Sequence, residues 1–269
     1  MRITPSTMLR ATASAVLLSL VPLVFAATGC GRSHLGTGWS FRKPAIPESE
    51  ALVYRVTADG DSIGTHRMIV KKGYFRDVPS FMIELVTRTR TGSLETIDSS
   101  VVFVSQDTIA PLSSFRFVRA GSRLVSTAAN YGDGSVAVTT FAGGEEQQKM
   151  LPAQPKTFDV DQLTFLGRTV TLGLNRPAKF NVVIPIGPPA GGVVTKAHFE
   201  AVGDEMVTVP AGSFDCRRIT LTVGENQVEL WYEKAPAQRL IRYGAAEVRM
   251  AFELVSAAVA GYPVAPVSE

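Results

Sequence analysis

The segment that decides the fold is Ala246–Leu254, whose sequence is Ala-Glu-Val-Arg-Met-Ala-Phe-Glu-Leu. Val248, Met250, Phe252 and Leu254 alternate along it with charged or small residues. A strict period of two predicts a β-strand with one buried face and one solvated face. The chain is therefore expected to close on a half-buried strand.

The sequence before this segment predicts further antiparallel strands. Turn signals with glycine or aspartate recur about every 8–14 residues from Leu52 to Phe141, which is typical of an antiparallel meander. Gly143–Lys149 is polar, and we expect a loop or a widened hairpin tip there. The later strands are expected at Ala178–Pro185, Thr195–Val202, Arg218–Val223, Gln227–Glu233 and Leu240–Tyr243.

One segment, Asp159–Arg168, departs from the strand pattern. Val160, Leu163 and Leu166 follow a helical spacing, and Asp159 with Gln162 forms the pattern of a capping box. The apolar face of such a helix needs a partner, and a curved sheet provides one. We therefore expect a mostly β fold: a strongly curved antiparallel meander or half-barrel with one short helix packed in or near its concave face.

The first 29 residues have the pattern of an export signal. Two arginines precede the apolar run Ala11–Val24, which is short for a membrane span. The segment Ala27-Thr28-Gly29-Cys30 resembles the bacterial lipobox, although the pattern prefers Leu at the position of Ala27. This resemblance implies that Cys30 is acylated, and Gly31 after it favours the outer membrane, facing the periplasm, in a cell with two membranes. Ordinary secretion is the alternative.

Composition limits the other classes of partner. Of the two cysteines, lipidation uses Cys30 and leaves Cys216 without an intramolecular disulfide partner. The whole chain has 27 basic and 24 acidic residues. Removal of Arg2 and Arg10 with the signal leaves 25 minus 24, a net charge of +1, so bulk charge does not favour nucleic-acid binding.

The domain organisation follows from these segments. We expect a signal peptide at 1–29, a flexible tether at 30–50, a single antiparallel β domain at 51–256 and a flexible tail at 257–269. Trp39 and Phe41 lie in the tether, either near the membrane surface or docked on the domain.

The sequence presents no catalytic, cofactor or metal site. His34, His66 and His198 lack metal-ligand spacing, so structural roles are expected for them. Cys216 is expected to be a small buried hydrophobe. Asp159 and Asp161 lie two residues apart at a helix start, where the positive end of the helix dipole accounts for them.

Trp231 is the most informative aromatic residue. In Gln227–Glu233 the apolar set is Val228, Leu230 and Tyr232, which places Trp231 on the other face of the strand. That face is either covered by other elements or part of a binding surface.

Three motifs taken in order resemble the bacterial exported family DUF3108. They are the Val209–Phe214 turn containing Pro-Ala-Gly, the Trp231-Tyr232 strand followed by Ala235–Tyr243, and the upstream helix Asp161–Arg168. The resemblance covers about Leu52 to Leu254. It implies an envelope protein without catalysis, with a fold similar to the lipoprotein carriers of the outer-membrane sorting pathway.

That comparison implies an apolar cavity, for which Leu163, Phe165, Leu166, Trp231 and Tyr232 are the candidate lining or packing residues. The leading hypothesis is a non-enzymatic, lipid-anchored protein that binds an apolar or amphiphilic ligand in the concavity. The second is an assembly module that presents a sheet face or edge to an envelope protein partner, and the third is a hydrolase that depends on Cys216 or His198.

Overall fold

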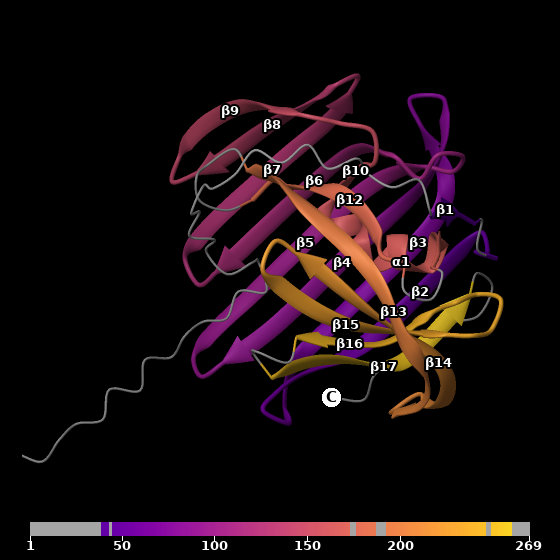
Figure 1. Cartoon of the computed structure of the whole chain (residues 1–269). Coiled ribbons are helices and arrows are strands. Elements are labelled where there is room, and N and C mark those ends of the chain that lie inside the picture. Colours follow the sequence, from indigo (N-terminus) through magenta and orange to yellow (C-terminus); the bar gives the residue numbers. More distant parts are fainter. Residues whose placement is uncertain (1–38, 43–44, 173–175, 187–191, 246–248, 260–269) are drawn as a thin grey trace, which may run out of the picture.

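The structure is a computed structural model that describes residues 39–42, 45–172, 176–186, 192–245 and 249–259. Fifteen strands form one sheet in the order β10-β12-β13-β14-β15-β16-β17-β2-β3-β4-β5-β6-β7-β8-β9. All neighbouring pairs are antiparallel except β10 and β12. The described residues thus form the mostly β, curved meander that the alternating segments predict, with one α-helix (Figure 1).

The strands of the first half are β1 Ser40–Phe41, β2 Ser49–Ala58, β3 Asp61–Phe75, β4 Val78–Thr91, β5 Leu94–Ser105, β6 Pro111–Ala120, β7 Arg123–Gly132, β8 Ser135–Ala142 and β9 Glu145–Pro152. Then follow β10 Thr157–Asp159, the 3₁₀ turn η1 Val160–Gln162, the helix α1 Leu163–Thr169 and β11 Val170–Thr171. The second half contains β12 Ala178–Ile184, β13 Val193–Val209, β14 Gly212–Val223, β15 Asn226–Glu233, β16 Leu240–Ala245 and β17 Met250–Val259.

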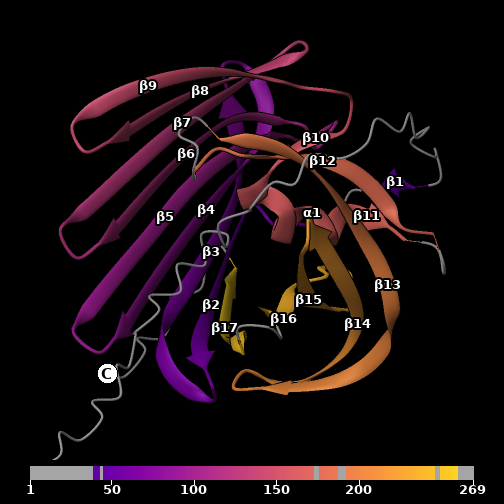
Figure 2. The ribbon, with the colours of Figure 1, turned by 60° about the vertical axis from the view of Figure 1, so that its left-hand side comes forward.

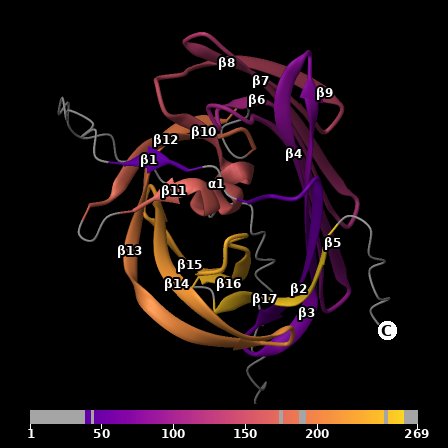
Figure 3. The same ribbon diagram turned by 90° about the vertical axis from the view of Figure 1, so that its right-hand side faces the viewer.

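The helix lies inside the curve of the sheet. Figure 3 shows α1 between the β2–β5 side and the β13–β17 side. Phe165 and Leu166 are fully buried there, and Phe165 contacts Phe81 of β4 with ring centroids 5.3 Å apart. Residues from both halves of the sheet pack against these side chains, so the helix lies at the centre of the main core.

The two ends of the sheet overlap without joining through backbone hydrogen bonds (Figure 2). A second, smaller core forms where β7–β9 cover the outer face of β12 and β13. Val183 and the half-buried Val194 contribute from one side, and Ala129, Val138 and Leu151 from the other. We call this contact the lap. It consists of side-chain contacts, so the sheet remains open.

The segment before β2 belongs in part to the folded domain. Trp39 is buried, its Nε1 donates to the Lys179 carbonyl oxygen at 3.3 Å, and Phe41 lies 5.0 Å from its ring. Strand β1 pairs with β11, and Ile46 is buried. Aromatic burial thus overrides the loop-like composition that predicts a tether up to residue 50. The signal at 1–29, Cys30 and the rest of 30–38 lie outside the described residues.

Two boundaries at strand ends differ from the sequence prediction. Strand β17 begins at Met250, after Arg249 at φ 48°, and continues to Val259 through an irregularity near Leu254. Three residues of the predicted 257–269 tail are therefore in the sheet, and 260–269 lie outside the described residues. The polar segment Gly143–Lys149, expected as a loop or a widened hairpin tip, is a turn at Gly143 and Gly144 followed by the start of strand β9, whose backbone pairs with β8 along its whole length.

Candidate functional site

Four of the five residues predicted to line or pack the concavity meet around α1. Leu163, Phe165 and Leu166 are buried, and the Tyr232 hydroxyl donates to the Thr164 carbonyl oxygen at 2.8 Å. A Cβ on Gly167 would lie 2.2 Å from that hydroxyl oxygen. Side chains thus fill the space between helix and β15, so these residues serve packing at this place.

Trp231 lies on the opposite face of β15 and is half-buried. Its Nε1 donates to Glu205 Oε1 at 2.6 Å, and the Arg242 guanidinium lies 5.1 Å from its ring centroid. Arg218 joins the same outer face through Glu205 at 3.5 Å. The structure therefore places Trp231 among charged side chains on the convex face, where its half-buried ring also packs against the edge of the main core.

The start of the helix carries the capping box that its spacing predicts. Asp159 Oδ1 accepts from the backbone N–H of Asp161 at 2.8 Å, and Gln162 Oε1 accepts from the backbone N–H of Asp159 at 3.2 Å. The Gln162 amide also donates to the Ile109 carbonyl oxygen, which fixes the helix to the β5–β6 connection. A local signal in the sequence thus positions two carboxylates inside the sheet.

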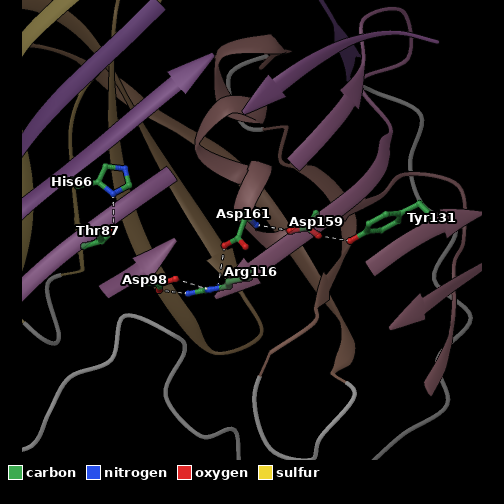
Figure 4. A network of polar contacts seen from close by, with 7 residues as sticks. All are labelled: His66, Thr87, Asp98, Arg116, Tyr131, Asp159 and Asp161. Carbon is green, nitrogen blue, oxygen red and sulfur yellow. Dashed lines mark hydrogen bonds and ion pairs between the residues drawn. The ribbon is translucent and has the colours of Figure 1, made fainter. Parts of the chain in front are cut away.

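These carboxylates belong to a buried polar network that we call the Arg116 cluster: Asp98, Arg116, Tyr131, Asp159 and Asp161 (Figure 4). Arg116 Nη2 lies 2.5 Å from Asp98 Oδ2 and its Nη1 lies 3.0 Å from Asp161 Oδ1. The Tyr131 hydroxyl donates to Asp159 Oδ2 at 2.6 Å. The helix start is therefore bonded to β6 and β7.

Burial controls the protonation of this cluster. It raises the pKa of Asp161 to about 7, since the stabilising Arg116 charge is opposed by Asp159 and Asp98. Burial also raises the pKa of Asp159, against hydrogen bonds from Ser114 and Tyr131. The pKa of Arg116 is raised by Asp161 and Asp98 despite its burial, so the guanidinium stays charged. One cation thus faces three acids, and Asp161 titrates near neutral pH.

Three polar atoms of this region have no hydrogen-bond partner among the described residues, although they are buried: Asp161 Oδ2, Thr127 Oγ1 and Thr140 Oγ1. Thr127 lies opposite Arg116 in the β6–β7 register, and Thr140 lies opposite Thr127 in the β7–β8 register. Directly opposite residues share a face of the sheet, so Thr127 and Thr140 lie with Arg116 on the concave side. Unpaired buried oxygens are unfavourable by about 1–3 kcal/mol each, so either an ordered water or the polar end of a ligand that supplies donors would stabilise this place.

A second buried ion pair fixes the end of the helix. Arg168 Nη1 lies 2.6 Å from Glu50 Oε2, with both side chains almost completely buried. Arg168 Nη2 donates to the Ala237 carbonyl oxygen at 2.7 Å. Arg239 reaches both Glu50 and Glu233. These bonds join α1 to β2 and to the β15–β16 connection, which is a structural role.

Burial holds two further titratable side chains, His66 and Cys216, in their uncharged forms. His66 is buried, its Nδ1 lies 2.7 Å from Thr87 Oγ1, and burial lowers its pKa to about 3. Burial raises the pKa of the Cys216 thiol to about 11, which suppresses the thiolate needed in a nucleophile. Within the described residues there is no group of three or more His, Cys, Asp or Glu side chains that could hold a metal ion.

Sequence reasoning missed the Arg116 cluster. It found Asp159 and Asp161 but assigned both to the helix dipole, and it gave no role to Arg116, Thr127 or Thr140. The available signal was a set of charged or hydroxyl residues at inward positions of predicted strands, where apolar residues are expected.

Comparisons with known proteins agree with the fold. The family model described as "Protein of unknown function (DUF3108)" matches residues 53–252. Among solved structures, the chain is similar to a beta-barrel-like protein of the domain of unknown function DUF1849 from Brucella abortus, with a TM-score of 0.51 and 12% identity. The alignment covers 79% of this chain and 98% of that one. No curated protein matches the chain.

Proposed function

Since the chain belongs to the DUF3108 family, whose function is unknown, we propose from its own residues that it is a non-enzymatic, lipid-anchored envelope protein. In this proposal an amphiphilic ligand binds in the concave face of the sheet, with its polar end at the Arg116 cluster. The observation that carries the proposal is the set of buried, unpaired oxygens of Asp161, Thr127 and Thr140.

The surroundings of these oxygens suit an amphiphile. The neighbouring row of inward-facing residues across β5–β8 is apolar except for one serine. It consists of Val102, Ser114, Ala129 and Val138. A ligand with one polar end and an apolar body would pair with the oxygens and, once the lap opens, would take the place of Val183 and Val194 over this row. A purely apolar ligand would leave the oxygens unpaired, so we narrow the expected ligand class to amphiphiles.

The charge balance of the cluster indicates the chemistry of the polar end. Arg116 already bonds to both Asp98 and Asp161, and the three unpaired atoms are acceptors or hydroxyls. An acidic head group would add a fourth negative charge to one guanidinium. A head group with hydroxyl or ammonium donors is therefore favoured.

The lap provides a route to the site. It is held by a small apolar core and by side-chain hydrogen bonds such as Lys149 Nζ to the Gly192 carbonyl oxygen at 3.0 Å. Its separation breaks no strand pairing, so we expect it to open at lower free energy than any part of the sheet.

The test is lipid extraction from the protein purified out of the membrane fraction, with mass spectrometry of the extract. The double variant Thr127→Val/Thr140→Val keeps side-chain shape and removes both unpaired hydroxyls. We expect it to fold as wild type and to lose most of the bound amphiphile. Thr139→Val is the matched control, because Thr139 precedes Thr140 in β8 but lies on the convex face. We expect this variant to keep the ligand.

An equal amount of extracted amphiphile from the double variant and wild type would refute the assignment of the site. The mass of the N-terminal peptide tests the anchor separately. Acylated Cys30 at the first position supports anchoring, and an unmodified thiol refutes it.

A second function is favoured by the convex face of the far end of the sheet. Phe115, Phe141 and Met150 are exposed there, and they share one face in the β6–β9 register. Strand β9 is also the end of the sheet order. Three exposed apolar side chains beside the last strand of the sheet suit an assembly module that docks an envelope protein. Crosslinking from residue 150 to one dominant protein, together with negative lipid extraction, would favour this function.

A further inference from the structure

The hairpin that joins β3 and β4 has an exposed apolar tip, Tyr74–Val78. Tyr74 is 75% exposed and Val78 is 39% exposed. In the register, Tyr74 lies opposite Pro79 and Phe75 lies opposite Val78, so both faces of the tip carry apolar side chains. A hairpin that faces only water normally has at least one polar face. This tip is therefore suited to an environment other than bulk water.

The structure holds this tip in a defined shape. Phe75 stacks on Phe103 of β5 with ring centroids 4.7 Å apart, and the Arg76 guanidinium lies 5.2 Å from the Phe75 ring centroid. Arg76 and Asp77 form the turn with φ angles of 47° and 66°, a conformation that normally selects asparagine or glycine. The sequence thus keeps a large basic side chain at a position where it is conformationally unfavourable.

Strand β2, the first strand of the large sheet along the chain, begins at the same end of the sheet as this tip. Ser49, the first residue of β2, lies opposite Lys71, and the Lys72 backbone N–H donates to the Glu48 carbonyl oxygen at 3.0 Å. Cys30 precedes Ser49 by 19 residues. This length spans at most about 68 Å, so an acylated Cys30 leaves this end of the sheet within reach of the bilayer.

The charges beside the tip fit a phospholipid surface. Lys71 and Arg76 are exposed and have no ion pair among the described residues, whereas Lys72 pairs with Glu48 at 3.1 Å. The acids here are Asp77 in the turn itself and the exposed Asp107, which follows the Gln106 whose N–H donates to the Pro79 carbonyl oxygen. Tyrosine with flanking basic side chains is the composition of interfacial anchors, in which the ring lies at head-group depth and the cations meet phosphates.

We propose that the Tyr74–Val78 tip inserts into the head-group region of a phospholipid bilayer and so fixes which end of the sheet faces the membrane. This inference rests on the proposed anchoring for the distance to the bilayer, but the insertion itself follows from the tip. None of the helices in the described part of the chain has the length and apolar character needed to cross a bilayer.

The test is fluorescence quenching by brominated lipids. Tyr74→Trp and Leu124→Trp variants of the protein purified from the membrane fraction are added to vesicles of phosphatidylethanolamine and phosphatidylglycerol. Leu124 is 51% exposed in the β6–β7 hairpin at the opposite end of the sheet, so it is the matched control. The native Trp39 and Trp231 contribute the same background to both variants.

We expect several-fold stronger quenching for Tyr74→Trp than for Leu124→Trp, together with a blue shift on vesicle binding. Equal quenching of the two variants, or none, would overturn the proposal. Because acylation of Cys30 is measured separately by mass, an unmodified Cys30 with selective quenching would refute the anchor and retain the insertion. Acylated Cys30 without selective quenching would support the anchor and refute the insertion.

Discussion

The Asp161→Asn substitution tests the electrostatics of the Arg116 cluster. The pKa of Asp161 is about 7 instead of 3.8, and burial is the main cause. The folded protein therefore holds this proton more strongly than the unfolded chain does. As the pH rises from about 4 to about 7, ionisation of Asp161 destabilises the fold, and the whole penalty is present above pH 7.

The size of the penalty follows from the pKa. A change from 3.8 to about 7 corresponds to about 4 kcal/mol at about 1.4 kcal/mol per pH unit. Polarisable surroundings reduce such values, and we expect about half. Asp161→Asn keeps an acceptor for Arg116 without the charge. It should be about 2 kcal/mol more stable than wild type at pH 8, with an advantage under about 1 kcal/mol at pH 5.

The assay is urea unfolding followed by the fluorescence of Trp39 and Trp231 at both pH values. Asp133→Asn, an exposed carboxylate in a turn, is the control and should change stability by less than about 0.5 kcal/mol. His66 lies outside the Arg116 cluster, and burial alone lowers its pKa, so its effect on stability cancels in the difference between wild type and variant. A variant less stable than wild type at pH 8 would show that Asp161 serves as a charged partner of Arg116, and our reasoning would be refuted.

Three further predictions concern the core. Gly167→Ala places a Cβ against the Tyr232 hydroxyl and should destabilise by about 2 kcal/mol in urea unfolding; unchanged stability would contradict the tight packing. Arg168→Met removes the nearer cation from the buried Glu50 carboxylate and leaves it only Arg239, whose Nε lies 3.5 Å from Glu50 Oε1. The substitution should cost about 3 kcal/mol, and the Arg168→Met/Glu50→Leu double variant should recover most of it in a double-mutant cycle. Burial lowers the pKa of His66 to about 3, so the unfolded chain binds this proton more strongly and the fold loses stability as the pH falls below about 6.5. His66→Gln should lack this loss. An equal loss in both proteins would refute the assignment to His66.

Local signals in the sequence were sufficient for much of the fold. The alternation of Met250, Phe252 and Leu254 is matched by buried residues in β17, and Asp159 with Gln162 forms the predicted capping box. Both patterns act within a few residues, which is why they can be recognised without the fold. Strand β9 was missed because it has no apolar period: its side chains are mostly exposed, and pairing with β8 is what makes it a strand.

The Arg116 cluster could not be predicted in this way. Arg116 and Asp161 are 45 residues apart, and the curl of the sheet alone brings β6 to the start of the helix. The helix dipole accounts for an aspartate at position 161 in the sequence, but it does not include the free-energy cost of burying the charged carboxylate. Trp39 was similarly ambiguous, since the sequence of a tether gives no measure of the contact with Phe180 that the structure shows.

The lap and the Arg116 cluster are connected by side-chain hydrogen bonds. Arg116 and Tyr131 belong to the strands that lead into the lap, and their bonds to Asp161 and Asp159 connect those strands to the helix. Opening of the lap would stretch these bonds and admit water to the carboxylates. Because burial is what disfavours the charge on Asp161, its ionisation favours the open arrangement and its protonation favours the closed one. The proposed ligand, with hydroxyl or ammonium donors, would reverse this preference by pairing with the carboxylate, and its binding would then be coupled to the protonation of Asp161.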